Sequence, residues 1–535
     1  MSVKTTVADI IVEQLAAWGV KYVFGIPGHS SLGIVEALRK NPSIKYLAVR
    51  HEEVAALMAS AYAKLTGEVG VCLTIAGPGA TNLMTGLYDA KMDRAPVLAL
   101  TGQVKLQYIG PGSFQEIDQD ALFHPVCVFN KTINSKEQTV ELVTLALKHA
   151  ITKRGVSHLA VPNNVQKELL DAEISPREGS LPNFLIEPSQ EILKEAVALI
   201  DEAKRPVIIV GWGARVVRED VLKLAKKISA PIATTFRAKG IISEYNRFSL
   251  GMVGKTGTIP ARKMVNTADL LIVFGSSFSE QTNIPKNIPI IQVDWDSMNV
   301  AKTHPVKLGI WGNTQVVIPK LLALVKAKER KELMQEARKL KASWENRLDK
   351  EANPRAIPLS PQYIMKVLED SIAKDVIISV DVGENCFWLG RNFRMNDQQT
   401  LLMSGYMGTM GFGLPGALAA KLAQPHRQVI CVTGDGGFSQ VMGDFLTAVK
   451  YNLNIIVIVL NNQELAMITV EQRAEGYPKF ATDLTNPDFA EYAKICGGAG
   501  FKVKRPGELE NVLEEALKSP KPTVVDIDTE PKRIF

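Results

Sequence analysis

Two short polar segments in the last third of the chain have the residue types of a metal and phosphate site. The first, Gly434-Asp435-Gly436-Gly437-Phe438, directly follows the apolar run QVICVT, and the second, Asn461-Asn462, follows NIIVIVL. A glycine turn between a strand and a helix, here expected to begin near Phe438, exposes backbone N–H groups that bind phosphate. A carboxylate and an amide oxygen are hard ligands that suit Mg²⁺. Together the two segments predict a divalent cation that holds a diphosphate.

The spacing of the two segments supports this interpretation. Asp435 precedes Asn462 by 27 positions, with one helix and one strand expected between them. In a right-handed strand–helix–strand unit, both residues reach the carboxyl ends of neighbouring parallel strands. Three protein oxygens, one of them a backbone carbonyl, leave room around Mg²⁺ for two phosphate oxygens and a water. GDGG alone is an ordinary turn, and the asparagine pair at this distance makes a cation site the better interpretation.

A second set of segments lies at an expected helix start and at expected strand ends. Arg50-His51-Glu52-Glu53 opens a helical pattern, which on its own is typical of a helix cap or a solvated helix start. Three further segments are Ala76–Ala80 (AGPGA) after the strand VCLTI, Ser404–Gly416 (SGYMGTMGFGLPG), and Asp381–Asn385 (DVGEN) at the end of another strand.

Taken together, these motifs resemble the thiamine-diphosphate signature of the pyruvate oxidase and acetolactate synthase superfamily, over about residues 1–530. The resemblance implies that Asp435, Asn462 and the main-chain carbonyl of Glu464 hold Mg²⁺. It also implies that Glu52 bonds the aminopyrimidine ring. A carboxyl that donates to the ring nitrogen favours the imino tautomer, whose basic nitrogen removes the proton of the thiazolium carbon. Glu53 is then a structural neighbour.

The same resemblance assigns cofactor contacts to the glycine-rich segments. Met410 would be the apolar wedge between the two rings, and the Gly408 carbonyl would accept a hydrogen bond from the 4′-amino group. The other thiamine diphosphate contacts implied in this way are Gly77, Pro78, Gly383, Glu384, Asn385, Gly436, Gly437, Leu465 and Ala466.

The central part of the chain carries a further series of strand-end turns. Gly211-Trp212-Gly213 follows RPVIIV, but Val216 stands where a GxGxxG fingerprint has its last glycine, which disfavours a nicotinamide site. The order of the turns resembles the FAD domain of pyruvate oxidases, and turns that bind nothing are the alternative. The FAD contacts implied by the resemblance are Gly211, Gly213, Arg215, Thr234, Lys239, Gly251, Val253, Gly275, Ser276, Asp294 and Trp295.

Residues on the substrate side bear on the reaction. Phe114 and Gln115 match the family's FQE segment, which lies over the thiazolium and is shared by oxidases and synthases. Glu471 stands where pyruvate oxidases have an acidic residue and biosynthetic acetolactate synthases have a tryptophan. The resemblance therefore favours oxidative decarboxylation of pyruvate, a small 2-keto acid. Carboligation of two 2-keto acids and simple decarboxylation remain alternatives, and the electron acceptor stays open.

The elements that must position these residues are short β-branched runs alternating with helical patterns. Continuous apolar strands indicate parallel sheets covered by helices on both faces. Polar, proline-bearing stretches at 171–188 and 345–361 predict linkers. We therefore expect an α/β fold of three doubly wound parallel-sheet domains, namely a pyrimidine-binding domain at 1–178, a central FAD-binding-like domain at 188–345 and a diphosphate- and Mg²⁺-binding domain at 358–535.

Composition narrows the class of protein and its partners. The 535 residues exceed a single core, and the net charge of +6 is dispersed, which argues against a nucleic-acid partner. The five cysteines form no CxxC pair, so buried thiols in a reducing compartment are expected. Neither a signal peptide nor a stable membrane anchor is evident, and we expect a cytoplasmic protein. The family resemblance implies self-association as a dimer of dimers, with Glu52 of one chain serving the diphosphate held by another.

Overall fold

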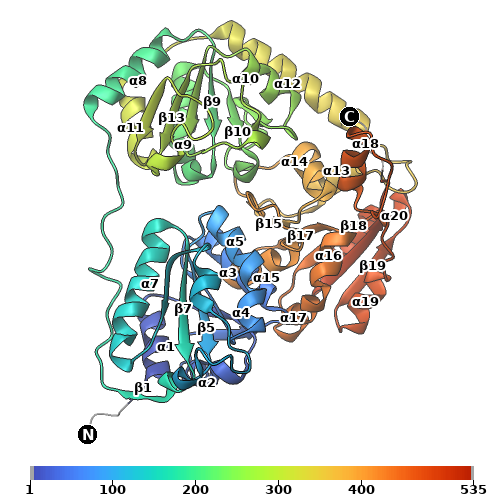
Figure 1. The fold of residues 1–535 in the computed structure, drawn as a ribbon. Helices are drawn as coiled ribbons and strands as arrows, with labels where there is room; N and C mark the ends of the chain where they lie inside the picture. The colour runs from blue at the N-terminus through green and yellow to red at the C-terminus, as the bar shows by residue number, and fades with distance from the viewer. Residues whose placement is uncertain (1–4, 532–535) are drawn as a thin grey trace.

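The computed structural model describes residues 5–531 as three α/β domains, each built on a six-stranded parallel sheet with helices on both faces (Figure 1). This confirms the expected fold class. In Figure 1 the first domain is blue to teal, the central domain green to yellow, and the third domain orange to red. The linker that leaves the first domain runs along one side of the molecule to reach the central one.

The first sheet has the strand order β3-β2-β4-β5-β7-β6. Its strands are β2 (Tyr22–Gly25), β3 (Lys45–Ala48), β4 (Gly70–Thr74), β5 (Val97–Gln103), β6 (Cys127–Thr132) and β7 (Val156–Pro162), and a separate antiparallel pair joins β1 (Thr5–Thr6) to β8 (Leu169–Leu170). The helices are α1 (Val7–Ala17), α2 (Leu32–Lys40), α3 (Glu52–Thr66), α4 (Pro78–Asn82), α5 (Met84–Met92), α6 (Gln119–Phe123) and α7 (Thr139–Lys153).

The central sheet has the order β11-β10-β9-β12-β13-β14. Its strands are β9 (Pro206–Val210), β10 (Ile232–Thr234), β11 (Ser249–Met252), β12 (Leu270–Phe274), β13 (Ile290–Asp294) and β14 (Leu308–Trp311). The helices are α8 (Gln190–Glu202), α9 (Arg218–Ile228), α10 (Ile259–Asn266), α11 (Thr314–Leu324) and α12 (Lys331–Glu351). Helix α12 continues to Glu351, past residue 345 where the sequence predicts a linker to begin.

The third sheet has the order β16-β15-β17-β18-β20-β19. Its strands are β15 (Ile377–Val380), β16 (Thr400–Leu402), β17 (Val429–Gly434), β18 (Ile456–Asn461), β19 (Ala499–Val503) and β20 (Thr523–Asp528). The helices are α13 (Pro361–Ser371), α14 (Glu384–Asn392), α15 (Gly413–Ala423), α16 (Asp435–Val441), α17 (Phe445–Lys450), α18 (Ala466–Ala474), α19 (Phe489–Ile495) and α20 (Pro506–Lys518).

Central strands such as β4 and β9 are buried along their whole length, which explains why their sequences are continuously apolar rather than alternating. His51 caps the start of helix α3, where its side chain accepts a hydrogen bond from the N–H of Glu53, and Gly67 in the left-handed conformation caps its end. Among residues 5–531, no helix is both long enough and apolar enough to cross a membrane.

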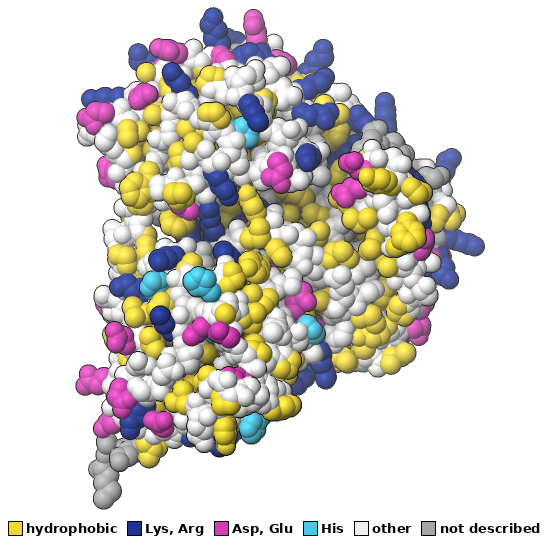
Figure 2. Space-filling model, in the orientation of Figure 1, with side chains coloured by type: hydrophobic (Ala, Val, Ile, Leu, Met, Phe, Trp, Pro, Cys, Tyr) yellow, Lys and Arg dark blue, Asp and Glu magenta, His cyan; other side chains and the backbone are white. Residues whose placement is uncertain are grey.

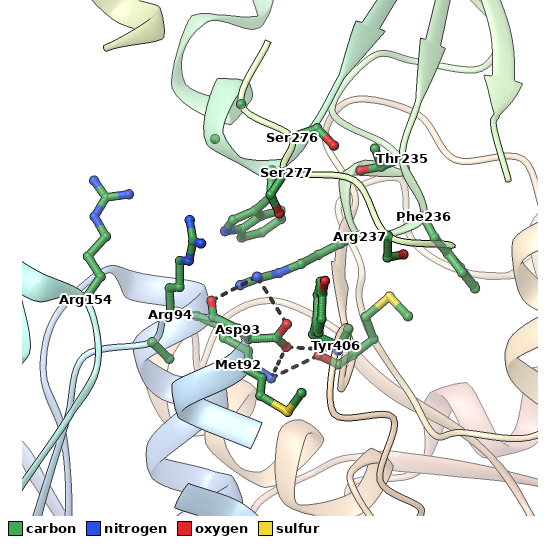
Figure 3. Close-up of a pocket in the computed structure, with 18 of the residues that line it drawn as sticks. Met92, Asp93, Arg94, Arg154, Thr235, Phe236, Arg237, Ser276, Ser277 and Tyr406 are labelled. Atoms are coloured by element: carbon green, nitrogen blue, oxygen red, sulfur yellow. Dashed lines mark hydrogen bonds and ion pairs between the residues drawn. The ribbon is translucent and has the colours of Figure 1, made fainter. Parts of the chain in front are cut away.

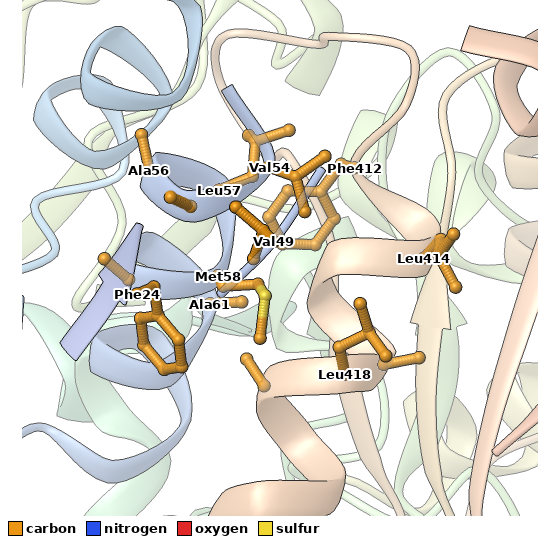
Figure 4. Packing of buried hydrophobic residues seen from close by; sticks show 14 of the residues in the cluster. Phe24, Val49, Val54, Ala56, Leu57, Met58, Ala61, Phe412, Leu414 and Leu418 are labelled. Atoms are coloured by element: carbon orange, nitrogen blue, oxygen red, sulfur yellow. The ribbon is translucent and has the colours of Figure 1, made fainter. Parts of the chain in front are cut away.

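The first and third domains share one hydrophobic core. Helices α3 and α15 pack against each other, and Met58 and Leu418 are fully buried in the layer between them (Figure 4). Polar contacts reinforce this join, because Asp444 accepts a hydrogen bond of 2.8 Å from the backbone N–H of Arg50. The start of α3 is thereby held in place by the third domain.

Candidate active site

Asp435 lies at the end of β17, where the strand order of the third sheet reverses between β15 and β17. Loops at such a switch point form a crevice outside the carboxyl ends of the strands. Helix α16 begins at Asp435 itself, three residues before the start expected near Phe438. A Cβ on Gly436 would lie 2.8 Å from the Leu465 side chain, so only glycine fits there without displacing that neighbour.

The Asp435 carboxylate is buried, and no cationic side chain among residues 5–531 pairs with it. Its oxygens accept from the N–H groups of Gly436 at 3.0 Å and Gln463 at 2.7 Å, and from the amide of Asn486 at 2.8 Å. Burial raises the pKa of Asp435, and these hydrogen bonds lower it in part. A buried carboxylate that only neutral donors compensate suits a bound cation.

The other two expected metal ligands follow β18. The side-chain oxygen of Asn462 accepts from the N–H of Glu464 at 3.1 Å, and Gln463 between them has the left-handed φ of 56°. The Glu464 side chain pairs with Lys479 at 3.3 Å, and the predicted metal ligand of this residue is its main-chain carbonyl. Within residues 5–531 no cluster of three or more His, Cys, Asp or Glu side chains could hold a metal. The predicted Mg²⁺ set needs only one carboxylate, so its residue types still fit.

The glycine-rich segment after β16 is held by Asp381 at the end of β15. Asp381 is fully buried and accepts from the N–H groups of Gly411 and Gly413 at 2.9 and 3.1 Å. Burial raises the pKa of Asp381 to about 6. The methyl group of Met410 would lie 3.3 Å from a Cβ on Gly436, so Met410 faces the diphosphate turn.

The loop after β15 adds the remaining third-domain residues. The amide of Asn385 donates to the carbonyls of Asp381 and Val432 at 2.6 and 3.3 Å, which joins this loop to β17. Gly383 has a φ of 132°, and Glu384 is buried at the start of α14. Of the other predicted contacts, Gly437 and Ala466 are buried, whereas Gly408 is exposed and Leu465 is half-buried.

Glu52 is the first residue of α3, and its carboxylate accepts from the amide of Asn82 at 3.0 Å. Gly77 after β4 has a φ of 61°, and a Cβ there would come within 3.0 Å of the Gln115 carbonyl. The Gly77–Pro78 turn therefore requires glycine for both its conformation and its neighbour. It also places the loop that carries Gln115 beside the turn.

The substrate-side residues lie on exposed elements of the chain. The Phe114 side chain is 88% exposed, and Gln115 has the left-handed φ of 64°. Their loop is closed by Glu116, whose carboxylate accepts from the N–H groups of Gly110, Gly112 and Ser113. Glu471 lies exposed on α18. These residues are presented at the surface of the chain rather than enclosed by it.

A cavity of about 1070 Å³ lies between the central domain and the other two domains (Figure 3). Its lining includes Gly383 and Gly408, two of the predicted thiamine diphosphate contacts, and also the turns after β9 and β12. Seven of the predicted flavin contacts also line this cavity, namely Gly213, Arg215, Val253, Gly275, Ser276, Asp294 and Trp295.

The turns after β9 and β12 touch through their backbones. The N–H of Gly213 donates to the Gly275 carbonyl, and a Cβ on Gly211 would come within 2.2 Å of that same oxygen. Gly211 itself does not line the cavity. Thr234, Lys239 and Gly251 also lie outside it: the Lys239 ammonium pairs with Glu244 at 2.5 Å, and the Thr234 hydroxyl is buried without a partner among the described residues.

Basic residues dominate the cavity, and Figure 2 shows dark-blue side chains gathered where the upper domain faces the lower left one. Arg154 lies over the ring of Trp295, and Arg215 and Arg237 both lie over Trp212. Burial, followed by repulsion from Arg154 and Arg237, lowers the pKa of Arg215 to about 10. Such a surplus of positive charge fits an anionic ligand, as the diphosphate of FAD would be.

Several of these cavity residues were missed from the sequence. Arg94 and Arg154 come from the first domain, and no local motif marks them as facing the central one. Trp212 stands inside the Gly211–Gly213 turn, and Arg237 stands between the predicted flavin contacts Thr234 and Lys239.

A buried ion-pair cluster at the floor of the cavity joins all three domains. The ammonium of Lys64 on α3 lies 2.6 Å from both Asp89 and Asp93, and it donates to the Met403 carbonyl. Asp93 also accepts from Arg237 of the central domain and from the N–H of Gly405 at 2.9 Å (Figure 3). Despite complete burial, Arg237 and Lys64 hold the pKa of Asp93 below its ordinary value.

Family comparisons agree with the division into three parts. Residues 5–122 match the N-terminal TPP binding domain of thiamine pyrophosphate enzymes, residues 193–321 match the central domain, and residues 381–527 match the C-terminal TPP binding domain.

Individual relatives cover almost the whole chain. A Bacillus subtilis (strain 168) protein named for its thiamine pyrophosphate, YdaP, is 41% identical over 98% of this chain and 91% of its own. Acetolactate synthase isozyme 1 large subunit of Escherichia coli (strain K12) is 31% identical over 98% of this chain and 95% of its own. Pyruvate oxidase of Lactiplantibacillus plantarum is 31% identical over 96% of this chain and 87% of its own.

Proposed function

The chain belongs to the thiamine pyrophosphate enzyme family, and on that basis we propose that it oxidatively decarboxylates pyruvate with thiamine diphosphate, Mg²⁺ and FAD. One observation carries the oxidase proposal. The basic cavity runs continuously from the glycine turns of the central sheet to Gly383 and Gly408 on the thiamine side. A flavin in that cavity would extend toward the place where the keto acid reacts.

Bound at the third-domain turn, thiamine diphosphate would supply a nucleophilic carbon and an electron sink for the loss of carbon dioxide. Asp435, Asn462 and the Glu464 carbonyl would hold the Mg²⁺ that neutralises its phosphates. Glu52 would hold a proton at the pyrimidine nitrogen, and Met410 would support the rings from beneath. Phe114, Gln115 and Glu471 would then shape the substrate side.

FAD would supply the two-electron acceptor. Gly213 and Gly275 bring two backbones close enough to cradle an extended chain. Arg154 and Arg215, which form no ion pair within residues 5–531, offer positive charge to its diphosphate. Pyruvate and water together give acetate and carbon dioxide, with two electrons and two protons leaving to the flavin. The reaction is balanced without any further oxidant until the flavin is reoxidised.

We also propose that the working unit is a dimer of dimers of cytoplasmic chains, with domains at 1–178, 188–345 and 358–535. Large exposed apolar side chains near the substrate-side elements, Phe114, Tyr477 and Phe480, support burial against a second copy. All five cysteines are free, which supports a reducing compartment.

A second candidate is carboligation of two 2-keto acids, because several relatives are named acetolactate synthases. The visible spectrum of the purified protein separates the two reactions. We expect a yellow protein whose flavin band bleaches with anaerobic pyruvate. A band that persists while acetolactate forms without an electron acceptor would establish the synthase, and a colourless protein that still decarboxylates would refute the role of FAD.

A further inference from the structure

The two oxygens of the Asp435 carboxylate have unequal hydrogen-bonding capacity left. Oδ2 accepts from the N–H of Gln463 at 2.7 Å and from the Asn486 amide at 2.8 Å, so both of its lone pairs are used. Within the part of the chain that the structure describes, Oδ1 accepts one hydrogen bond, from the N–H of Gly436 at 3.0 Å. A carboxylate oxygen offers about two lone-pair sites. One site therefore remains, and it is on Oδ1.

Asn486 reaches Asp435 from a segment outside the strand–turn–helix motif. This segment is fastened to the loop after β18 by two backbone bonds of 2.8 Å, from Leu465 to the Thr482 carbonyl and from Leu484 to the Gln463 carbonyl. The two amide hydrogens of Asn486 go to Asp435 Oδ2 and to Asn461 Oδ1, the latter at 3.1 Å. Asn486 thus fixes the rotation of the carboxylate.

From Asn486, a series of side-chain hydrogen bonds continues into the interior of the third domain. Asn461 donates to Asp526 Oδ1 at 3.0 Å, and Lys502 donates to Asp526 Oδ2 at 2.9 Å. Asp526 is fully buried, and its oxygens also receive the N–H of Phe489. Because each member is held by the next, the Asn486 amide has little freedom to turn away from Asp435.

We propose that Asn486 is the positioning residue of the metal site: by occupying Oδ2, it makes Asp435 a single-oxygen ligand through Oδ1. This inference rests on the proposed binding of Mg²⁺ with thiamine diphosphate. Mg²⁺ requires near-ideal octahedral geometry, which a single-oxygen carboxylate allows, whereas Ca²⁺ accepts two-oxygen carboxylates and more ligands. Residues that orient metal ligands commonly change metal affinity about 10–100-fold when they are removed.

The test is a titration of the assembled protein with Mg²⁺ and, separately, Ca²⁺ at saturating thiamine diphosphate, followed by tryptophan fluorescence. In Asn486→Ala, we expect Mg²⁺ binding to weaken about 10–100-fold. Ca²⁺ binding should weaken less, because Oδ2 keeps its bond from Gln463 but gains one free lone pair, which makes it available as a second ligand oxygen. The ratio of the two dissociation constants is measured within one preparation, so a general loss of folded protein does not move it.

Asn454→Ala is the matched control, because its amide makes a bond of 3.0 Å to the Ser519 carbonyl of the same domain. It should leave both affinities unchanged. Proportional weakening of both metals in Asn486→Ala, or no weakening, would overturn the positioning role. Failure of the unaltered protein to bind Mg²⁺ with thiamine diphosphate would instead overturn the proposed function, and the inference with it.

Discussion

The first and third domains have the same strand order, and the central domain does not. Numbered along the chain, their strands run second, first, third, fourth, sixth, fifth across each sheet, whereas the central sheet runs third, second, first, fourth, fifth, sixth. Lys64 lies near the end of α3, and Lys421 lies near the end of α15. The number of residues that separates these two lysines equals the number that separates Gly77 from Gly434. The two outer domains thus correspond closely in sequence position as well as in topology.

Equivalent loops of the two domains carry different chemistry. The loop after the second strand leads to Glu52 in the first domain and to Met410 in the third. In the first domain, the turn after the third strand contains Gly77, whose backbone lies close to Gln115. In the third domain, the equivalent turn provides the carboxylate of Asp435. In the proposed function, the same scaffold would therefore supply a proton-handling side and a metal-binding side. Function is determined by the residues in these loops and not by the fold.

The largest expected effect tests this division of roles. Glu52→Gln keeps the size of the side chain but removes the acid, and we expect turnover to fall about 10²–10⁴-fold at saturating cofactors. Affinity for thiamine diphosphate and Mg²⁺ should change little, because the phosphate side lies in the other domain. Decarboxylation of pyruvate and a cofactor titration provide the two measurements.

The control is Glu53→Gln, the next residue on the same helix, which should retain most of the activity. Burial raises the pKa of Glu53, so losing its charge costs little. If Glu52→Gln turned over pyruvate as fast as this control, the proton-handling role of the first domain would be wrong.

The site residues that could be predicted are those whose signal is local. Asp435 and Asn462 follow apolar strands at a spacing that fixes them at neighbouring strand ends, and Glu52 opens a helix after another strand. Strand-end turns depend on a few consecutive residues, so both the fold class and these turns were accessible from the sequence.

Residues that meet only through packing between domains could not be predicted. Asp93 lies in the first domain, yet its partners include Arg237 of the central domain and Gly405 of the third. Asn486 lies in an exposed polar stretch with no motif around it. Lys239 is a flavin contact implied by the family resemblance, but its side chain is buried against Glu244, away from the cavity.

The second prediction compares the two corresponding lysines. Lys64 is buried between Asp89 and Asp93, whereas Lys421 is half-buried and donates only to the Arg427 carbonyl at 2.9 Å. Removing one partner from a buried ion pair costs about 3–5 kcal/mol, and losing one hydrogen bond costs about 1 kcal/mol. We therefore expect Lys64→Met to lower the free energy of unfolding much more than Lys421→Met, as measured by urea denaturation.

A second variant separates charge from packing at this position. In Lys64→Met, Asp93 keeps its ion pair with Arg237, but Asp89 loses its cationic partner. Adding Asp89→Asn removes that uncompensated carboxylate, and part of the lost stability should return. Equal losses in Lys64→Met and Lys421→Met would show that the ion-pair cluster contributes nothing beyond an ordinary contact.

The smallest expected effect concerns a polar cluster that only the first domain has. The third residue of β7 is His158, whereas the third residue of β20 is Val525. His158 is fully buried, its ring nitrogens contact Thr101 and Asn130 at 2.8 and 2.6 Å, and its ring stacks on Phe123. Burial among these neutral groups lowers the pKa of His158 to about 3.

This histidine makes stability depend on pH in a defined direction. Between about pH 6.5 and 3 the unfolded chain binds a proton at His158 that the folded chain does not, so stability is present above pH 6.5 and falls as the pH falls. From pH 7 to 5 the loss is about 2 kcal/mol for one such group. In His158→Gln the difference between urea unfolding at the two pH values should shrink by that amount, whatever the absolute stability of the variant. His426→Gln, at an exposed site, should keep the original difference, and an unchanged difference in His158→Gln would mean that His158 already binds its proton in the folded protein.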